Sequence, residues 1–172
     1  LKPLDIQAAI GRIQLRKLPA FIEKRKENWN YLRSGLKRSE DFLEFALPTH
    51  ATDWSDLSGF EWDETKCKSD CSWFGFKISI KENAPFSRTD LAKELDKNKI
   101  GNRMLFGGNL IRQPAFIEIK NENPDAYKVI GDTKASDAIM NNTLFLGTYP
   151  GLTKSMMDFE INVINNYISK FK

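Results

Sequence analysis

Apolar residues near the start of the chain recur at helical spacing. They form one stripe, made of Ile6, Ala9, Ile10 and Ile13. Pro3 suits the first turn of this helix, and Pro19 predicts that the helix ends or kinks there. Gly11 lies inside the same helix, where a glycine is unfavourable unless another segment packs closely against it. The pattern therefore predicts a helix in which one position needs a close neighbour.

A second helix is predicted from about Pro19 to Lys37, with apolar residues on one face and charges on the other. Its predicted apolar face consists of Phe21, Ile22, Arg25, Trp29, Leu32 and Leu36. We interpret the charged run 23–27 as a solvated face rather than a binding patch.

The far end of the chain carries the clearest amphipathic helix. Thr153 is a good N-cap for it. Behind this cap, apolar residues step by four, three, four and three: Met157, Ile161, Ile164, Ile168 and Phe171. Ser87 begins a shorter predicted helix, and Asp90 completes a capping box with it.

Strict alternation of apolar and polar residues predicts a strand that begins at Trp73. Its apolar members are Phe74, Phe76, Ile78 and Ile80, and we expect Trp73 and Phe74 to pack in the core rather than stack on a base. Further strands are predicted at 100–106 and 144–146. Interleaved helices and strands with short connections predict an α+β fold. We expect a small antiparallel or mixed sheet of about three strands, covered on one side by helices.

Residues 49–71 interrupt this pattern with an acidic, turn-rich segment. Such a length without clear periodicity is unusual inside a compact domain. The segment carries Trp54, Phe60 and Trp62. We interpret it as an exposed loop insertion whose aromatic residues fold back onto the body, with a partner-binding loop as the alternative.

Composition excludes several classes of protein. With 172 residues, 41% of them hydrophobic, and a net charge of +3, the chain suits one globular domain rather than a disordered segment. No apolar run reaches the length of a membrane span, and the charge is not clustered as nucleic-acid binding requires. Cys67 and Cys71 are the only cysteines and cannot supply the four ligands of a structural metal site, so we predict none.

The stretch GNRMLFGGNLIRQPAF at 101–116 holds the strongest candidate chemistry. Guanidinium groups such as those of Arg103 and Arg112 bind phosphate oxygens with two hydrogen bonds. Asn109 and Gln113 supply directional hydrogen bonds to hydroxyl or carbonyl groups. These residues suit a phosphorylated, hydroxyl-rich ligand such as a nucleotide sugar. The alternative is a tight turn whose arginines pair with surface carboxylates.

Several blocks resemble the DegT/DnrJ/EryC1/StrS family of enzymes that depend on pyridoxal phosphate (PLP). LKPLDIQAAIGRIQL opens the chain and FIEKRKENWNYL follows at 21–32. SWFGF at 72–76, the 101–116 block and IMNNTLFLGTYPGLT at 139–153 resemble the 3-dehydratase branch of that family. The resemblance implies the C-terminal small domain of the type I aminotransferase fold, with 1–38 as a helical link to a large domain.

The resemblance also implies what the complete enzyme would do. It would remove the C3 hydroxyl of a nucleotide-diphosphate 4-keto-6-deoxyhexose, with CDP-4-keto-6-deoxyglucose favoured, for dideoxysugar and O-antigen biosynthesis. The cofactor would act as pyridoxamine phosphate (PMP), and the resemblance leaves room for a [2Fe-2S] cluster and a flavin or iron–sulfur reductase partner. We expect a cytoplasmic homodimer that contacts neither membrane nor nucleic acid.

By the same resemblance, the catalytic and cofactor-binding residues lie upstream of Leu1, so none is expected in this chain. Lys2, Arg103, Asn109, Arg112 and Gln113 carry over as candidate substrate-binding residues. Alternatives remain open: a PLP-dependent sugar aminotransferase of the same family, or a non-catalytic interaction domain.

Overall fold

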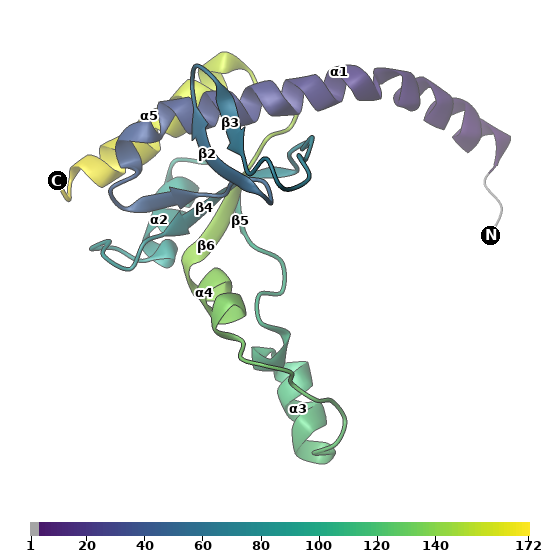
Figure 1. The fold of residues 1–172 in the computed structure, drawn as a ribbon, viewed down its shortest axis with the longest axis vertical. Coiled ribbons are helices and arrows are strands. Elements are labelled where there is room, and N and C mark those ends of the chain that lie inside the picture. The colour runs from purple at the N-terminus through teal and green to yellow at the C-terminus, as the bar shows by residue number, and fades with distance from the viewer. Residues whose placement is uncertain (1–3) are drawn as a thin grey trace.

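A four-stranded antiparallel sheet forms the centre of this computed structural model, which describes residues 4–172 (Figure 1). The strands lie in the order β1 (Leu43–Phe45), β4 (Gly75–Ile80), β6 (Thr143–Gly147) and β5 (Asn102–Met104). The α+β prediction is confirmed, but the sheet has one strand more than expected. β1 was missed because its alternation covers only three residues, too few to distinguish a strand from chance.

One face of the sheet is buried under three helices. These are α1 (Asp5–Gly35), α2 (Arg88–Lys97) and α5 (Lys154–Ser169). Alternation turns Phe76, Ile78 and Ile80 of β4 toward them, together with Leu144 and Leu146 of β6. The predicted caps are confirmed, since Ser87 accepts a hydrogen bond from the Asp90 N–H and Thr153 accepts one from the Met156 N–H.

The first element, α1, is one continuous helix of 31 residues that contains Pro19, so the predicted boundary between two helices at Pro19 is wrong. Proline removes one backbone hydrogen bond, here the one that Leu15 would accept. Both Leu15 and Pro19 are exposed, so that carbonyl faces solvent rather than an apolar core, and losing its partner does not end the helix. The α1 residues buried by this chain begin only at Asn28, and the outer half of the helix projects away from the body (Figure 1).

The interpretation of 23–27 as a solvated face is also wrong at one position. Arg25 is half-buried and donates hydrogen bonds to the backbone carbonyls of Trp73, at 2.9 Å, and Phe74, at 3.3 Å. One turn later the buried Asn28 donates to the Tyr149 carbonyl at 2.9 Å. These contacts tie the middle of α1 to the segment before β4 and the segment after β6, which lie at the same end of the sheet.

Residues 49–71 contain a β-hairpin rather than an unstructured loop. Its strands are β2 (Ala51–Ser55) and β3 (Gly59–Trp62), with Gly59 at φ +70° in the turn. The expectation that the aromatic residues fold back is confirmed: the ring of Trp29 lies 5.9 Å from that of Trp54 and 5.2 Å from that of Phe60. A register shift in β2 hides the alternation from sequence reading.

Three elements form an arm below the sheet in Figure 1: the short 3-10 helix η2 (Leu110–Arg112), α3 (Pro114–Glu122) and α4 (Lys134–Asn142). A second short 3-10 helix, η1 (Lys37–Ser39), directly follows α1. Sequence reading missed α3, because its isoleucines Ile117 and Ile119 are exposed and mark no buried face. Within residues 4–172, no helix has the length and apolar character that crossing a membrane requires.

Trp29 is 1% exposed and touches four other aromatic rings, so we expect Trp29→Ala to lower the free energy of unfolding by about 3–5 kcal/mol. Urea denaturation followed by circular dichroism measures this loss. Leu57→Ala, at a fully exposed position on the hairpin, is the matched control and should change stability by less than about 0.5 kcal/mol. Equal effects of the two substitutions would contradict the packing described above.

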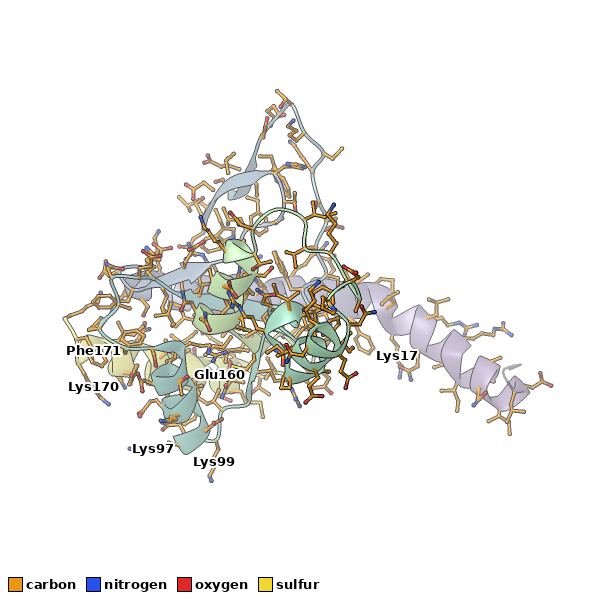
Figure 2. All side chains as sticks on the ribbon, turned by 90° about the horizontal axis from the view of Figure 1, so that it is seen from below. Lys17, Lys97, Lys99, Glu160, Lys170 and Phe171 are labelled. Atoms are coloured by element: carbon orange, nitrogen blue, oxygen red, sulfur yellow. The ribbon has the colours of Figure 1, made fainter. Side chains whose placement is uncertain are left out.

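A second stability prediction concerns Glu160 on α5 (Figure 2). Burial raises the pKa of this carboxyl from 4.5 to about 7, and its Oε2 has no hydrogen-bond partner within residues 4–172. A raised pKa in the folded state means that stability is lost as pH rises from about 4.5 through about 7. Glu160→Gln should remove this loss. The measurement is the free energy of unfolding of the parent and the variant, each by denaturation at pH 4.5 and at pH 8. A variant with the same pH dependence as the parent would contradict it.

Candidate functional site

The face of the sheet opposite the helices carries a row of three side chains. Phe145 on β6 lies between Lys77 of β4 and Arg103 of β5, its direct partners in strand register. Opposed residues on neighbouring strands point to the same side, so two cations flank one aromatic ring. Within residues 4–172, no ion pair or side-chain hydrogen bond engages either cation. The row therefore presents positive charge to any ligand that reaches this face.

Three phenylalanines beside this row form what we name the aromatic wall: Phe74, Phe106 and Phe145. The ring centroids of Phe74 and Phe145 lie 5.8 Å apart, and Phe106 lies 6.3 Å from each. Phe74 is 69% and Phe106 is 78% exposed. Phe106 also adopts φ +50°, a left-handed conformation that bulky side chains rarely take. Strain and exposure of this kind concentrate where a fold serves a ligand or partner.

The aromatic wall borders a groove of about 600 Å³. Arg103, Asn102 and Asp96 also line the groove, with Ala92 and Met104. Asp96 accepts a hydrogen bond of 2.8 Å from the Asn102 amide, so this carboxylate is already engaged. The free charge in the groove is that of Arg103. Flat rings and a guanidinium suit an anionic ligand that also offers an apolar or ring surface.

A carboxylate on α4 holds the glycine loop that follows β5. Asp137 accepts two hydrogen bonds of 3.0 Å from Arg112 and one of 2.8 Å from the buried Asn109. Gln113 donates to the Gly107 carbonyl at 2.8 Å. Gly108, at φ +61°, lies against Met140, and an added Cβ there would come within 2.5 Å of the methionine side chain. The loop is therefore fixed in one conformation.

The same contacts change the charge behaviour of Asp137. Hydrogen bonds from Arg112 and then from Asn109 lower the pKa of this carboxyl to about 2. The pKa of Arg112 is raised by the same pair. Asp137 thus remains ionised throughout the ordinary pH range, so its ion pair with Arg112 is kept over that range.

The structure separates the predicted site residues into two groups. Asn109, Arg112 and Gln113 stand together in the glycine loop, where their polar groups bond within the loop and to Asp137. Arg112 pairs with a carboxylate, as the tight-turn alternative proposed. Arg103 stands apart, on the sheet and in the groove. Lys2 lies outside the described residues.

The aromatic wall and Lys77 were not recognised from the sequence. Phe74 was expected in the core, and this is wrong because the core alternation begins only at Gly75, one residue later. Trp73, expected in the core with it, does stack on Trp29 at 4.6 Å. Phe145 was read only as part of a short apolar strand. Lys77, Phe145 and Arg103 lie side by side only because of the register between their strands, which the sequence alone does not reveal.

Comparison with known proteins places this architecture in a family. The sequence profile of the DegT/DnrJ/EryC1/StrS aminotransferase family matches residues 2–165. The chain belongs to this family. The lipopolysaccharide biosynthesis protein RfbH of Salmonella typhimurium is 42% identical over 167 residues, 97% of this chain and 33% of RfbH. A dTDP-4-dehydro-2,6-dideoxy-D-glucose 3-dehydratase of Saccharopolyspora spinosa is 35% identical over 99% of this chain and 32% of that protein.

Solved structures agree on the fold. An E. coli GDP-4-keto-6-deoxy-D-mannose-3-dehydratase with bound hydrated PLP superimposes with a TM-score of 0.71, at 24% identity, over 95% of this chain and 36% of that one. The expected aminotransferase fold is confirmed. The chain spans about a third of the length of the family members it matches.

Ordering of the glycine loop by Asp137 is testable. Asp137→Asn should keep the fold but weaken the Arg112 contact, so amides 107–113 should exchange with solvent faster in NMR hydrogen exchange. Asp132→Asn, on the exposed loop before α4, is the matched control and should leave these amides unchanged. Because the pKa is lowered to about 2, the parent loop should stay ordered above about pH 4 and loosen as pH falls toward 2. Unchanged exchange in both tests would contradict this role.

Proposed function

We propose that this chain is the C-terminal, substrate-cleft domain of a PMP-dependent nucleotide-diphosphate 4-keto-6-deoxyhexose 3-dehydratase, an enzyme of dideoxysugar and O-antigen biosynthesis. The observation that carries the proposal is 35% identity over 99% of the chain to a protein named as a dTDP-sugar 3-dehydratase. RfbH, at 42% identity, is named for lipopolysaccharide biosynthesis, which uses such sugars. The groove supports the proposal with a ligand surface of suitable chemistry.

In this proposal, the groove binds and orients the nucleotide sugar. Arg103 in the groove faces the diphosphate, and Lys77, outside the groove lining on the far side of Phe145, adds positive charge to the same face of the sheet, since cations are the usual partners of phosphate oxygens. The aromatic wall packs against the sugar or base and excludes water from that side. Arg112 keeps N–H groups beyond those given to Asp137, and Gln113 keeps its carbonyl oxygen, so both remain able to contact ligand hydroxyls or phosphates. Asn109 shapes the loop, and Lys2 is carried over from the resemblance.

The groove itself does not fit the cofactor. PLP chemistry needs an acid to pair with the pyridine nitrogen, and the acid on the groove, Asp96, already binds Asn102. No lysine lines this groove within residues 4–172. We therefore assign cofactor binding and proton transfer to the part of the protein that its relatives contain and this chain lacks.

The finer parts of the proposal follow the resemblance. The nucleotide is CDP, the enzyme is a cytoplasmic homodimer, and a [2Fe-2S] cluster with a flavin or iron–sulfur reductase completes the reaction. The alternative is a PLP-dependent sugar aminotransferase, the reaction class for which the matched family is named. The two reactions differ in whether the C3–O bond is broken.

The complete enzyme should release water from CDP-4-keto-6-deoxyglucose in the presence of PMP, and mass spectrometry should detect a product 18 Da lighter before reduction. Arg103→Ala should raise KM about tenfold or more, because one charge-assisted phosphate contact is lost. Lys66→Ala, at an exposed position in the 49–71 segment, is the matched control and should leave KM unchanged.

Amino transfer to C4 without loss of the C3 hydroxyl would replace the dehydratase proposal by the aminotransferase alternative. Absence of both activities, and of nucleotide-sugar binding, would leave a non-catalytic interaction domain. An Arg103→Ala enzyme with unchanged KM would remove this residue from the substrate site.

A further inference from the structure

One edge of the sheet lies inside the groove described above. β5 is the last strand in the order β1–β4–β6–β5, so one side of it has no neighbouring strand. Arg103 and Phe145 line the groove from the open face of the sheet. Ala92 and Asp96 line it from α2, on the helix side. A groove that is lined from both faces passes over the edge between them, so the backbone of β5 is part of its wall.

The strand register shows which backbone groups of β5 point toward this edge. In an antiparallel sheet, the N–H and C=O of one residue point to one side, and those of the next residue point to the other. The Lys81 N–H donates to the Phe42 carbonyl at 2.9 Å, so odd-numbered residues of β4 turn their backbone groups toward β1. Even-numbered residues of β4 therefore bond to β6, and odd-numbered residues of β6 bond to β5.

This alternation pairs the backbone of Arg103 with that of Phe145 and turns the backbone groups of Asn102 and Met104 outward. The Met104 carbonyl accepts the Phe106 N–H at 2.9 Å, so the chain turns away there. The N–H and C=O of Asn102 remain side by side, and no turn, cap or side chain of residues 4–172 bonds to them. The groove thus holds one backbone donor beside one backbone acceptor.

We propose that this edge binds the base of the nucleotide sugar, through the N–H and C=O of Asn102. Each nucleobase carries an acceptor beside a donor on one edge of its ring. A backbone N–H beside a C=O matches that pair as a neighbouring strand would. This inference rests on the proposed function and names the part of the groove that holds the base.

The charges on the two sides of the edge give the nucleotide one orientation. The guanidinium of Arg103 lies on the open face, where it attracts the diphosphate. The carboxylate of Asp96 lies on the helix side and accepts the Asn102 side-chain amide at 2.8 Å. Its negative charge repels a phosphate but not an uncharged base. The diphosphate therefore lies toward the open face, and the base lies at the edge between the two charges.

An added β-strand is the other usual occupant of a free sheet edge. β5 has only three residues, and the turn at Phe106 takes the last outward carbonyl. An ordinary strand has five or six residues, and short edge strands are a known protection against pairing. Two backbone groups are too few for a strand but enough for one base. The aromatic wall, which borders the same groove, offers the apolar surface that a base also needs.

Binding measurements on the complete protein separate the base from the phosphates. The probes are pyrophosphate and whichever of CDP, dTDP and GDP binds most tightly in isothermal titration. Asn102→Pro removes the outward N–H, which an edge strand tolerates, and Asn102→Ala removes the same side chain but keeps the N–H. The proline variant should bind the nucleotide about five- to tenfold more weakly than the alanine variant, because one hydrogen bond is lost. Both variants should bind pyrophosphate equally, whereas Arg103→Ala should weaken both probes.

Hydrogen–deuterium exchange of the unsubstituted protein tests the same bond without a variant, and it decides the matter if Asn102→Pro does not fold. The Asn102 N–H should exchange quickly in the free protein. Saturating nucleotide should slow this exchange about tenfold, and saturating pyrophosphate should not. Mass spectrometry of peptides that span residues 101–105 measures the difference.

The proposal is overturned if the proline and alanine variants bind the nucleotide equally, or if pyrophosphate protects the edge as well as the nucleotide does. It is also overturned if none of the three nucleotides binds. Loss of water from the nucleotide sugar without protection of the edge would retain the proposed function and remove only this inference. Protection of the edge by nucleotide without loss of water would contradict the proposed reaction and retain the base site.

Discussion

The packing of one indole ring holds together segments that are far apart in the sequence. Trp29 on α1 stacks on Trp73 at 4.6 Å and contacts Trp54 and Phe60 of the hairpin and Phe76 of the sheet. Burial of so large a ring contributes more apolar area than any aliphatic side chain in the core. Since Trp73 directly precedes Phe74, the position of this ring also determines where the aromatic wall stands.

Hydrogen bonds from α1 hold the same segments that the Trp29 ring packs against. Arg25 donates to the carbonyls of Trp73 and Phe74, and the Thr148 hydroxyl donates to the Trp73 carbonyl at 2.6 Å. Buried Asn28 satisfies carbonyls of the segment that follows β6. Backbone groups at two strand ends, which would otherwise be buried without partners, are thus bonded to one helix. The start of β4 and the end of β6 are held in fixed relation to α1.

The sequence predicted correctly those elements whose own residues carry a clear periodicity or a capping motif. The alternation in β4, the cap at Thr153 and the stripe of α5 needed no information from elsewhere in the chain. The hairpin, β1 and α3 were missed because each is defined by a partner or by solvent rather than by its own periodicity. The glycine loop was found by composition, but Lys77, Phe145 and Arg103 are united only by the register of three strands that lie far apart in the sequence.

The continuity of α1 through Pro19 makes the helix a lever. Its 31 residues extend about 46 Å at 1.5 Å per residue. Arg25 lies about 30 Å along the helix from Asp5 and binds the backbone at the start of β4, directly beside Phe74. A rigid tilt of the helix by 5° about its outer end would displace this point by about 3 Å. A change in the direction of the first turns of α1 therefore shifts the start of β4, and with it the aromatic wall.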